Sequence, residues 1–107
     1  MRILLDECVP RRLRRELPGH DVWTVPEMGW SGKKNGELLR LMTPQGFEVL
    51  LTTDQNLRHQ QNLKAVGVAV VVLAAATNRL ADLVPLIPSA RAALGAIQPG
   101  QVVEITV

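Results

Sequence analysis

The most constraining feature of this sequence is a series of short apolar runs separated by helix-like segments. The run at 68–73 (VAVVVL) is dominated by valine, which favours strands, and the run at 2–6 (RILLD) is unbroken up to its acid. Runs of this length are typical of strands buried on both faces of a parallel sheet. Further strands are predicted at 20–25, 47–52 and 102–107. The alternation of strands and helices predicts an α/β fold with a parallel sheet and right-handed crossovers.

Three helices are predicted between these strands, at 9–17, 36–42 and 79–97, and 55–63 is compatible with a fourth. In the first, Pro10 suits the opening turn, and an apolar stripe is formed by Val9, Leu13 and Leu17. The segment 79–97 contains Pro85 and Pro88, so we expect a break or kink there.

Composition limits the class of protein. With 107 residues, of which 47% are hydrophobic, the chain fits one domain over 1–107 with a real core. Two tryptophans, one phenylalanine and no tyrosine disfavour RNA binding by aromatic stacking platforms, and we expect Trp23 to lie in the core. The one cysteine, Cys8, excludes an intrachain disulfide framework. We expect Cys8 to be a small buried residue, and the protein to be soluble and cytoplasmic, without a membrane partner or signal peptide.

Acidic residues follow two of the predicted strands. Asp6 ends the first apolar run, Asp54 follows the run at 47–52, and Glu37 lies on the helix at 36–42. Ligands of parallel sheets bind at the carboxyl ends of the strands, so we expect these three carboxylates to converge there. Clustered carboxylates repel one another unless a cation lies among them, and Mg²⁺ or Mn²⁺ prefers such oxygen ligands. A bound ion of this kind activates water for phosphodiester hydrolysis.

Structural alternatives stand beside these assignments. Asp54 has the sequence context of a helix cap or Asx-turn before Gln55, and an acid such as Glu37 is favoured in any first helical turn. Asp6 lies too far before the predicted helix to cap it. For Glu7, the sequence is equally compatible with a role as a second metal ligand and with a solvated position beside Asp6.

Basic residues are concentrated next to the acids. The predicted first helix has a dense arginine face, made of Arg11, Arg12, Arg14 and Arg15, and the loop before 36–42 adds Lys33 and Lys34. Together with a net charge of +2, this pattern predicts contacts with the phosphates of RNA. An ordinary solvated helix face is the alternative.

Three segments resemble one known family. They are 3–10 (ILLDECVP), 29–41 (GWSGKKNGELLRL) and 51–63 (LTTDQNLRHQQNL), and all three resemble short bacterial PIN-like proteins. The resemblance implies a three-layer α/β/α sandwich around a mainly parallel sheet, an acidic pocket for Mg²⁺ or Mn²⁺, and cleavage of RNA. Many such proteins are toxins held inactive by a small antitoxin protein, and the arginine face would then be a candidate site for an acidic antitoxin.

The resemblance also assigns roles to individual residues. Asp6 matches the first acid of the family pattern, Asp54 matches the acid after two threonines, and Glu37 is our match for the helical acid. Asn35 and Asn56 stand where relatives often carry acids. An asparagine can bind a metal through its amide oxygen but adds no charge, so both are possible auxiliary ligands.

Three hypotheses follow. The first is a metal-dependent ribonuclease, as the toxin of a toxin–antitoxin pair, with catalytic Asp6, Glu37 and Asp54. The second is a noncatalytic PIN-like module that binds RNA or a protein, which Asn35 and Asn56 favour. The third is a hydrolase of small phosphoesters on the same fold. An exposed last strand at 102–107 would also allow a homodimer.

Overall fold

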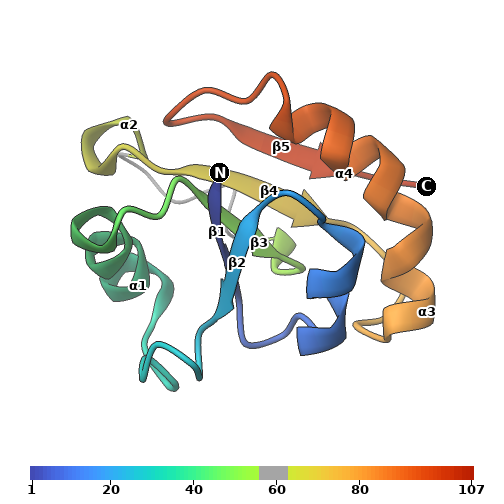
Figure 1. Cartoon of the computed structure of the whole chain (residues 1–107), viewed down its shortest axis with the longest axis horizontal. Coiled ribbons are helices and arrows are strands. Elements are labelled where there is room, and N and C mark those ends of the chain that lie inside the picture. The colour runs from blue at the N-terminus through green and yellow to red at the C-terminus, as the bar shows by residue number, and fades with distance from the viewer. Residues whose placement is uncertain (56–62) are drawn as a thin grey trace.

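A computed structural model describes residues 1–55 and 63–107 of the chain. Its centre is a sheet in the order β2-β1-β3-β4-β5, in which every pair of neighbouring strands is parallel (Figure 1). The strands are β1 (Arg2–Leu5), β2 (Asp21–Thr24), β3 (Val49–Thr52), β4 (Ala69–Leu73) and β5 (Val102–Ile105). The predicted α/β class is therefore confirmed.

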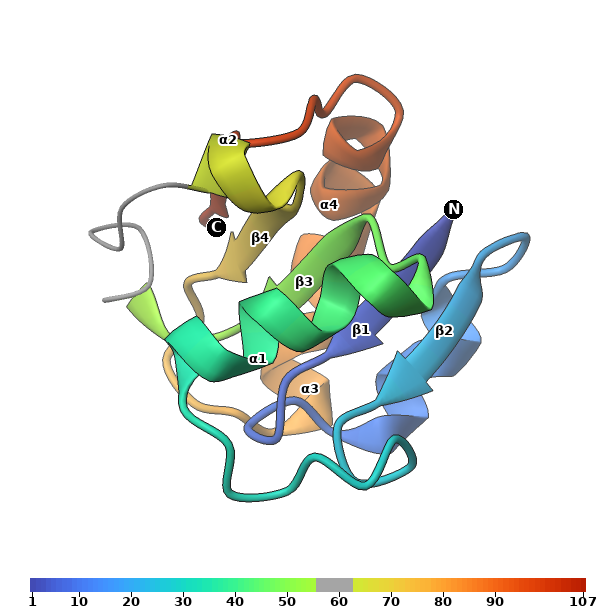
Figure 2. The same cartoon turned by 90° about the vertical axis from the view of Figure 1, so that its left-hand side faces the viewer.

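Helices cover both faces of the sheet (Figure 2). One face carries α1 (Asn35–Met42), its 3-10 extension η2 (Thr43–Gln45) and α2 (Leu63–Val66). The other face carries η1 (Arg11–Glu16), α3 (Leu80–Leu83), η4 (Val84–Leu86) and α4 (Ile87–Leu94). The result is the expected three-layer sandwich.

The strands divide their side chains between two cores because successive residues of a strand point to opposite faces. Ile3 and Leu5 of β1 belong to the core under η1 and α4, whereas Leu4 belongs to the core under α1. All five residues of β4 are buried, as expected for a strand covered on both sides. This alternation also determines which polar side chains meet beyond the strand ends.

The predicted helix at 9–17 is wrong in type and extent. It is the 3-10 helix η1, and Pro10 lies at its N-cap in an extended conformation instead of in the first turn. The stripe of Val9, Leu13 and Leu17 is buried as expected. A 3-10 helix rises more per residue than an α-helix. The chain can therefore cover the distance from the end of β1 back to the start of β2 with fewer residues.

The proline break in 79–97 is confirmed. The segment consists of α3, the short 3-10 helix η4 that contains Pro85, and α4 with Pro88 in its first turn. The predicted helix at 36–42 is α1, which begins one residue earlier at Asn35. Of the predicted helix at 55–63, residues 56–62 lie outside the described part of the chain.

Trp23 is not a core residue, contrary to expectation. It is 38% exposed because β2 is the edge strand of the sheet and alternates exposed and buried residues. Its indole N–H donates to Asp21 Oδ1 at 2.8 Å.

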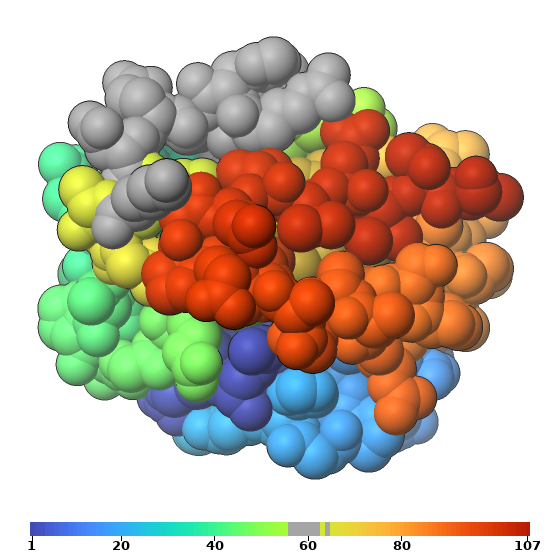
Figure 3. All heavy atoms as spheres, turned by 90° about the horizontal axis from the view of Figure 1, so that it is seen from above, coloured from blue at the N-terminus to red at the C-terminus, as the bar shows by residue number. Residues whose placement is uncertain are grey.

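The last third of the chain packs against the first strands of the sheet. Leu83, Leu86, Ala90 and Leu94 are buried in one core with the residues of β1 and β3. In the space-filling view, the C-terminal segment (orange to red) fills the middle of one face beside the first residues (blue) (Figure 3). β5 forms the second edge of the sheet, as predicted. Within 1–55 and 63–107, no helix has the length and apolar character needed to cross a membrane.

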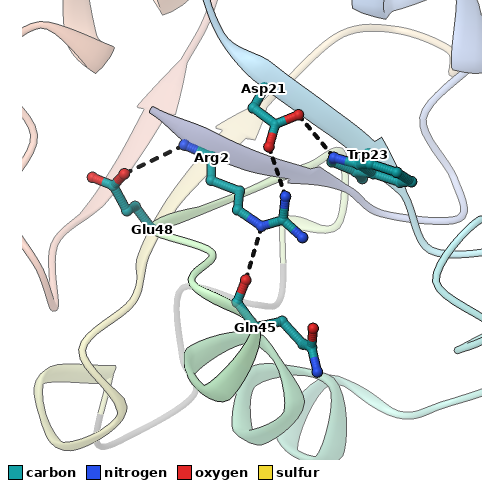
Figure 4. A network of polar contacts seen from close by, with 5 residues as sticks. All are labelled: Arg2, Asp21, Trp23, Gln45 and Glu48. Carbon is teal, nitrogen blue, oxygen red and sulfur yellow. Dashed lines mark hydrogen bonds and ion pairs between the residues drawn. The ribbon is translucent and has the colours of Figure 1, made fainter.

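The strands all begin at one end of the sheet, which we call its amino-terminal edge, and end at the opposite one, its carboxyl-terminal edge. Arg2 connects several segments at the amino-terminal edge (Figure 4). Its guanidinium donates to Asp21 Oδ2 at 2.6 Å and to the Gln45 carbonyl at 2.8 Å, and its backbone N–H donates to Glu48. The same guanidinium lies 4.4 Å from the centre of the Phe47 ring. The hydrogen bond from Arg2, followed by that from the Trp23 indole, lowers the pKa of Asp21. The charged groups of Arg2 and Asp21 at this edge therefore have their partners within the protein.

Candidate functional site

The candidate site lies where the strand order reverses. From β1 the chain moves to β2 on one side and then to β3 on the other, so β1 and β3 are neighbours whose crossovers lead away in opposite directions. Loops diverge at the carboxyl ends of such strands and leave a crevice, which is where open parallel sheets bind ligands. Asp6 directly follows β1, and Asp54 lies two residues beyond β3.

A buried threonine joins the two acids. Leu5 pairs with Leu51, and the Asp6 N–H continues the ladder by donating to the Leu51 carbonyl at 3.0 Å. Asp6 and Thr52 are consequently on the same face of the sheet, and the Thr52 hydroxyl donates to Asp6 Oδ2 at 2.7 Å. The same hydroxyl oxygen accepts the backbone N–H of Asp54 at 3.0 Å. Thr52 is fully buried, so this bridge holds both acidic segments in place.

Asn35 links this network to α1. It is the first residue of that helix, and its side-chain amide donates to Asp54 Oδ2 at 3.2 Å. Because α1 packs on the sheet face toward which Asp6 and Thr52 point, its first residue lies next to the strand ends. Asn35 thus joins the site, as the resemblance implied. The other auxiliary candidate, Asn56, lies outside the described residues.

The network borders an open cleft of about 540 Å³. Its walls come from the loops after β1, β3 and β4 and from the loop before α1. The lining residues are Asp6, Glu7, Cys8, Gly32, Lys33, Thr53, Asp54 and Asn78. Cys8 is partly buried instead of buried as expected: it packs against the core and also lines the cleft, with its Sγ 3.6 Å from the Thr52 hydroxyl.

Glu37 does not join the two aspartates. Its carboxylate pairs with Lys33 Nζ at 3.5 Å, its side chain is 52% exposed, and it does not line the cleft. Among the described residues, no group of three or more acidic, histidine or cysteine side chains is arranged to hold a metal. The expected convergence of three carboxylates is therefore wrong for this part of the chain. The reason is helical geometry: the side chain of Asn35 points toward Asp54, and a residue two positions later points elsewhere.

Glu7 and Lys33 flank the aspartates with different partners. The Glu7 carboxylate accepts the backbone N–H of Gly32, which ties the loop after β1 to the loop before α1. Lys33 also lines the cleft, with its ammonium paired to Glu37, whereas Lys34 is the N-cap residue of α1 and is exposed. Among the described lining residues, the cleft thus carries three carboxylates and one lysine.

The arginine face is divided by the structure. Arg14 is partly buried and forms an ion pair with Glu27 in the turn after β2. The other three, Arg11, Arg12 and Arg15, are exposed. The backbone hydrogen bond from Thr24 lowers the pKa of Glu27, and the hydrogen bond from the Arg14 guanidinium lowers it further. Three arginines of η1 are therefore available to an external anion, and the fourth is structural.

Two participants were missed from the sequence. Thr52 ends a strand that is otherwise apolar, and its spacing of two from Asp54 was the signal that could have identified it. Asn78 lines the cleft from the loop after β4 but lies in no pattern that singled it out.

The donor set suits a small hard cation. Asp6 and Asp54 present carboxylate oxygens to one cleft, and the Thr53 side chain lies beside them. Mg²⁺ is commonly held by one or two carboxylates, with water and substrate phosphate in its remaining positions. The described residues therefore fit a site with two protein carboxylates, and Glu37 is not one of them.

Comparison with known proteins identifies the family. A family model described as a PIN like domain matches residues 1–75, which is well over half of the chain. The protein belongs to the PIN-like domain family. No curated protein and no solved structure matches it. The matched part of this PIN-like domain contains β1 to β4 and all cleft residues except Asn78, so the family segment contributes nearly the whole site.

Proposed function

We propose that this PIN-like domain is a metal-dependent ribonuclease. The observation that carries the proposal is the placement of Asp6 and Asp54 in one cleft at the reversal of strand order, with Thr52 bridging them. Membership of the PIN-like family supports nuclease chemistry more than any other.

The cleft residues divide the work of binding and orientation. Asp6 and Asp54 would hold Mg²⁺ or Mn²⁺, which supplies an activated water and neutralises charge on the leaving oxygen. Thr52 and Asn35 orient the two carboxylates through the hydrogen bonds described above. Lys33 lines the cleft, where its ammonium would exchange its exposed pair with Glu37 for a phosphate of the substrate.

The substrate would reach the cleft along the basic face. Arg11, Arg12 and Arg15 are exposed on η1, which directly follows the loop carrying Asp6. Contacts of this kind bind phosphates without reading sequence and weaken steeply as salt rises. Lys34 would extend this surface from the other side of the cleft.

The test is cleavage of a labelled RNA pool by the purified protein with Mg²⁺ or Mn²⁺. Asp6→Asn and Asp54→Asn, as well as EDTA, should reduce cleavage by a factor on the order of 100 or more. Asp21→Asn is the matched control, since it is the same chemical change at the opposite edge of the sheet. Full activity in either cleft variant would refute the assignment.

A second candidate is a noncatalytic PIN-like module that binds RNA or a protein. Two observations favour it: Asn35 meets Asp54 as a neutral amide, and Glu37 is paired with Lys33 and does not line the cleft. Thermal melting with added Mn²⁺ separates the candidates. A cation that binds only the folded state stabilises it by about 2.7 kcal/mol at a concentration of 100 Kd, and Asp6→Asn should abolish this gain. Absence of any shift in the wild type would favour the noncatalytic module.

The biological setting is also a proposal. We propose a toxin that acts on RNA in the cytoplasm and is restrained by an antitoxin protein. The exposed arginines of η1 are the surface on which an acidic antitoxin segment would compete with RNA. The edge strand β5 is a candidate surface for a homodimer.

A further inference from the structure

A second hollow adjoins the cleft. Its volume is about 420 Å³, within the range of about 300–1,000 Å³ that is usual for sites of small organic groups. Asp6 and Glu7 line both hollows, so the short loop after β1 is a wall that the cleft and the second hollow share. A chain whose phosphate lies in the cleft would therefore have its adjacent nucleotide within reach of the second hollow.

The walls of this hollow differ from those of the cleft. Val9, Pro10 and Pro26 give it apolar sides, whereas the cleft is lined mainly by polar side chains. A ring bound against such residues gains from burial of its faces, and a free phosphate does not. The apolar walls therefore favour a flat, uncharged group.

The carboxylate of Glu27 gives the hollow one hydrogen-bond acceptor in a fixed position. Glu27 lines it, and one oxygen of Glu27, Oε1, accepts the Thr24 backbone N–H at 2.9 Å and pairs with Arg14. The other oxygen, Oε2, takes part in neither of these two contacts. These contacts keep the carboxylate in one orientation. A carboxylate accepts hydrogen bonds from the amino groups of bases, as in contacts to the amino group of cytosine.

Arg11 supplies the opposite charge at the same place. It is exposed and lines the hollow, whereas its neighbours Arg12 and Arg15 are exposed but do not line it. A guanidinium here can bind the phosphate that follows a base seated in the hollow. The hollow thus combines apolar walls, one fixed acceptor and one cation, which are complementary to a ring, an amino group and a phosphate.

We propose that the second hollow binds the base of the nucleotide next to the phosphate in the cleft, and that it prefers bases with an amino group over uracil. The proposal rests on RNA as the substrate and adds a specificity element to that function. Arg11 and Glu27 are its binding residues, whereas Arg12 and Arg15 contribute only general attraction.

The test is binding of short fluorescent single strands of adenylate, cytidylate or uridylate to the full chain, with Ca²⁺ in place of Mg²⁺. Adenylate and cytidylate should bind about fivefold more tightly than uridylate, as expected for one gained hydrogen bond. Arg11→Gln should weaken binding about tenfold and Arg12→Gln no more than about twofold, because only Arg11 lines the hollow. Glu27→Gln should remove the preference between cytidylate and uridylate, provided that its melting temperature shows a folded protein.

The outcomes separate the two proposals. Equal affinity for the three strands, together with equal losses in Arg11→Gln and Arg12→Gln, would overturn the base site while RNA binding and cleavage stood. No binding and no cleavage of any RNA would overturn both. Should Glu27→Gln fail to fold, the comparison of Arg11→Gln with Arg12→Gln decides alone, since both residues are exposed.

Discussion

The two edges of the sheet treat their charged side chains differently. At the amino-terminal edge, Arg2 binds the Asp21 carboxylate and the Gln45 carbonyl and lies over the Phe47 ring. At the carboxyl-terminal edge, Asp6 receives a hydroxyl and a backbone amide, and it has no ion pair within residues 1–55 and 63–107. Arg2 at the amino-terminal edge is matched by an internal anion, whereas Asp6 at the carboxyl-terminal edge is positioned without being neutralised by a described residue.

This difference indicates separate purposes for the two edges. A carboxylate held by neutral donors keeps its negative charge directed into the cleft, where a cation or a cationic group can reach it. A carboxylate paired with arginine has little remaining attraction for an external ion. We therefore assign the proposed function to the carboxyl-terminal edge and a contribution to stability to the amino-terminal edge.

The largest effect among the following predictions should come from Thr52→Val. The change keeps the shape of the side chain but removes the hydroxyl that joins Asp6 to Asp54, so cleavage should fall about 10- to 100-fold, as for residues that orient metal ligands. The free energy of unfolding should fall by about 1 kcal/mol because partly buried partners lose a hydrogen bond. Rates and melting are compared with Thr106→Val, an exposed control. Unchanged cleavage would show that the bridge does not orient the acids.

Arg2→Met, at the amino-terminal edge, should lower stability without lowering the rate of cleavage. Loss of the cation–π contact with Phe47 alone is worth about 1 kcal/mol, which lowers the melting temperature by roughly 4 °C in a domain of this size. Cleavage of the folded variant should stay at the wild-type rate. Arg40→Met, an exposed change on α1, serves as the control. A folded Arg2→Met protein without activity would break the distinction between the edges.

Glu37→Gln should have a small effect on cleavage. It removes the ion pair with Lys33, and exposed pairs four residues apart on a helix are worth about 0.3–0.5 kcal/mol, or roughly a twofold change. The change should appear mainly in KM, since Lys33 lines the cleft and is the proposed phosphate contact. Steady-state cleavage rates measure it. A loss of activity as large as that of Asp6→Asn would show that Glu37 acts as a metal ligand, as the sequence predicted.

The smallest effect should be the pH dependence contributed by Asp21. Arg2 lowers its pKa below the usual 3.8, so the folded state binds fewer protons than the unfolded state. The resulting stabilisation is present above about pH 4 and is lost as the pH falls through the lowered pKa. The gap in melting temperature between wild type and Asp21→Asn should therefore be constant near neutrality and close in acid. A gap that widens in acid would contradict the sign.

Much of the fold was predictable from local patterns. The five strands were expected within one or two residues at their starts, because an apolar run between polar residues marks a buried strand. The break near Pro85 was also predictable, since proline lacks the backbone N–H that a helix interior requires. The 3-10 form of η1 was not, because its sequence suits an α-helix equally well and the length of the crossover decides between them.

The site was predictable only in part. The sequence by itself determined that Asp6 and Asp54 follow β1 and β3, since each acid is next to its own strand. Only the tertiary structure decided that β1 and β3 are neighbours, that Thr52 joins the acids, and that α1 directs Asn35 instead of Glu37 toward them. Strand order and helix rotation depend on packing between segments distant in the chain, and a local pattern carries no information about either.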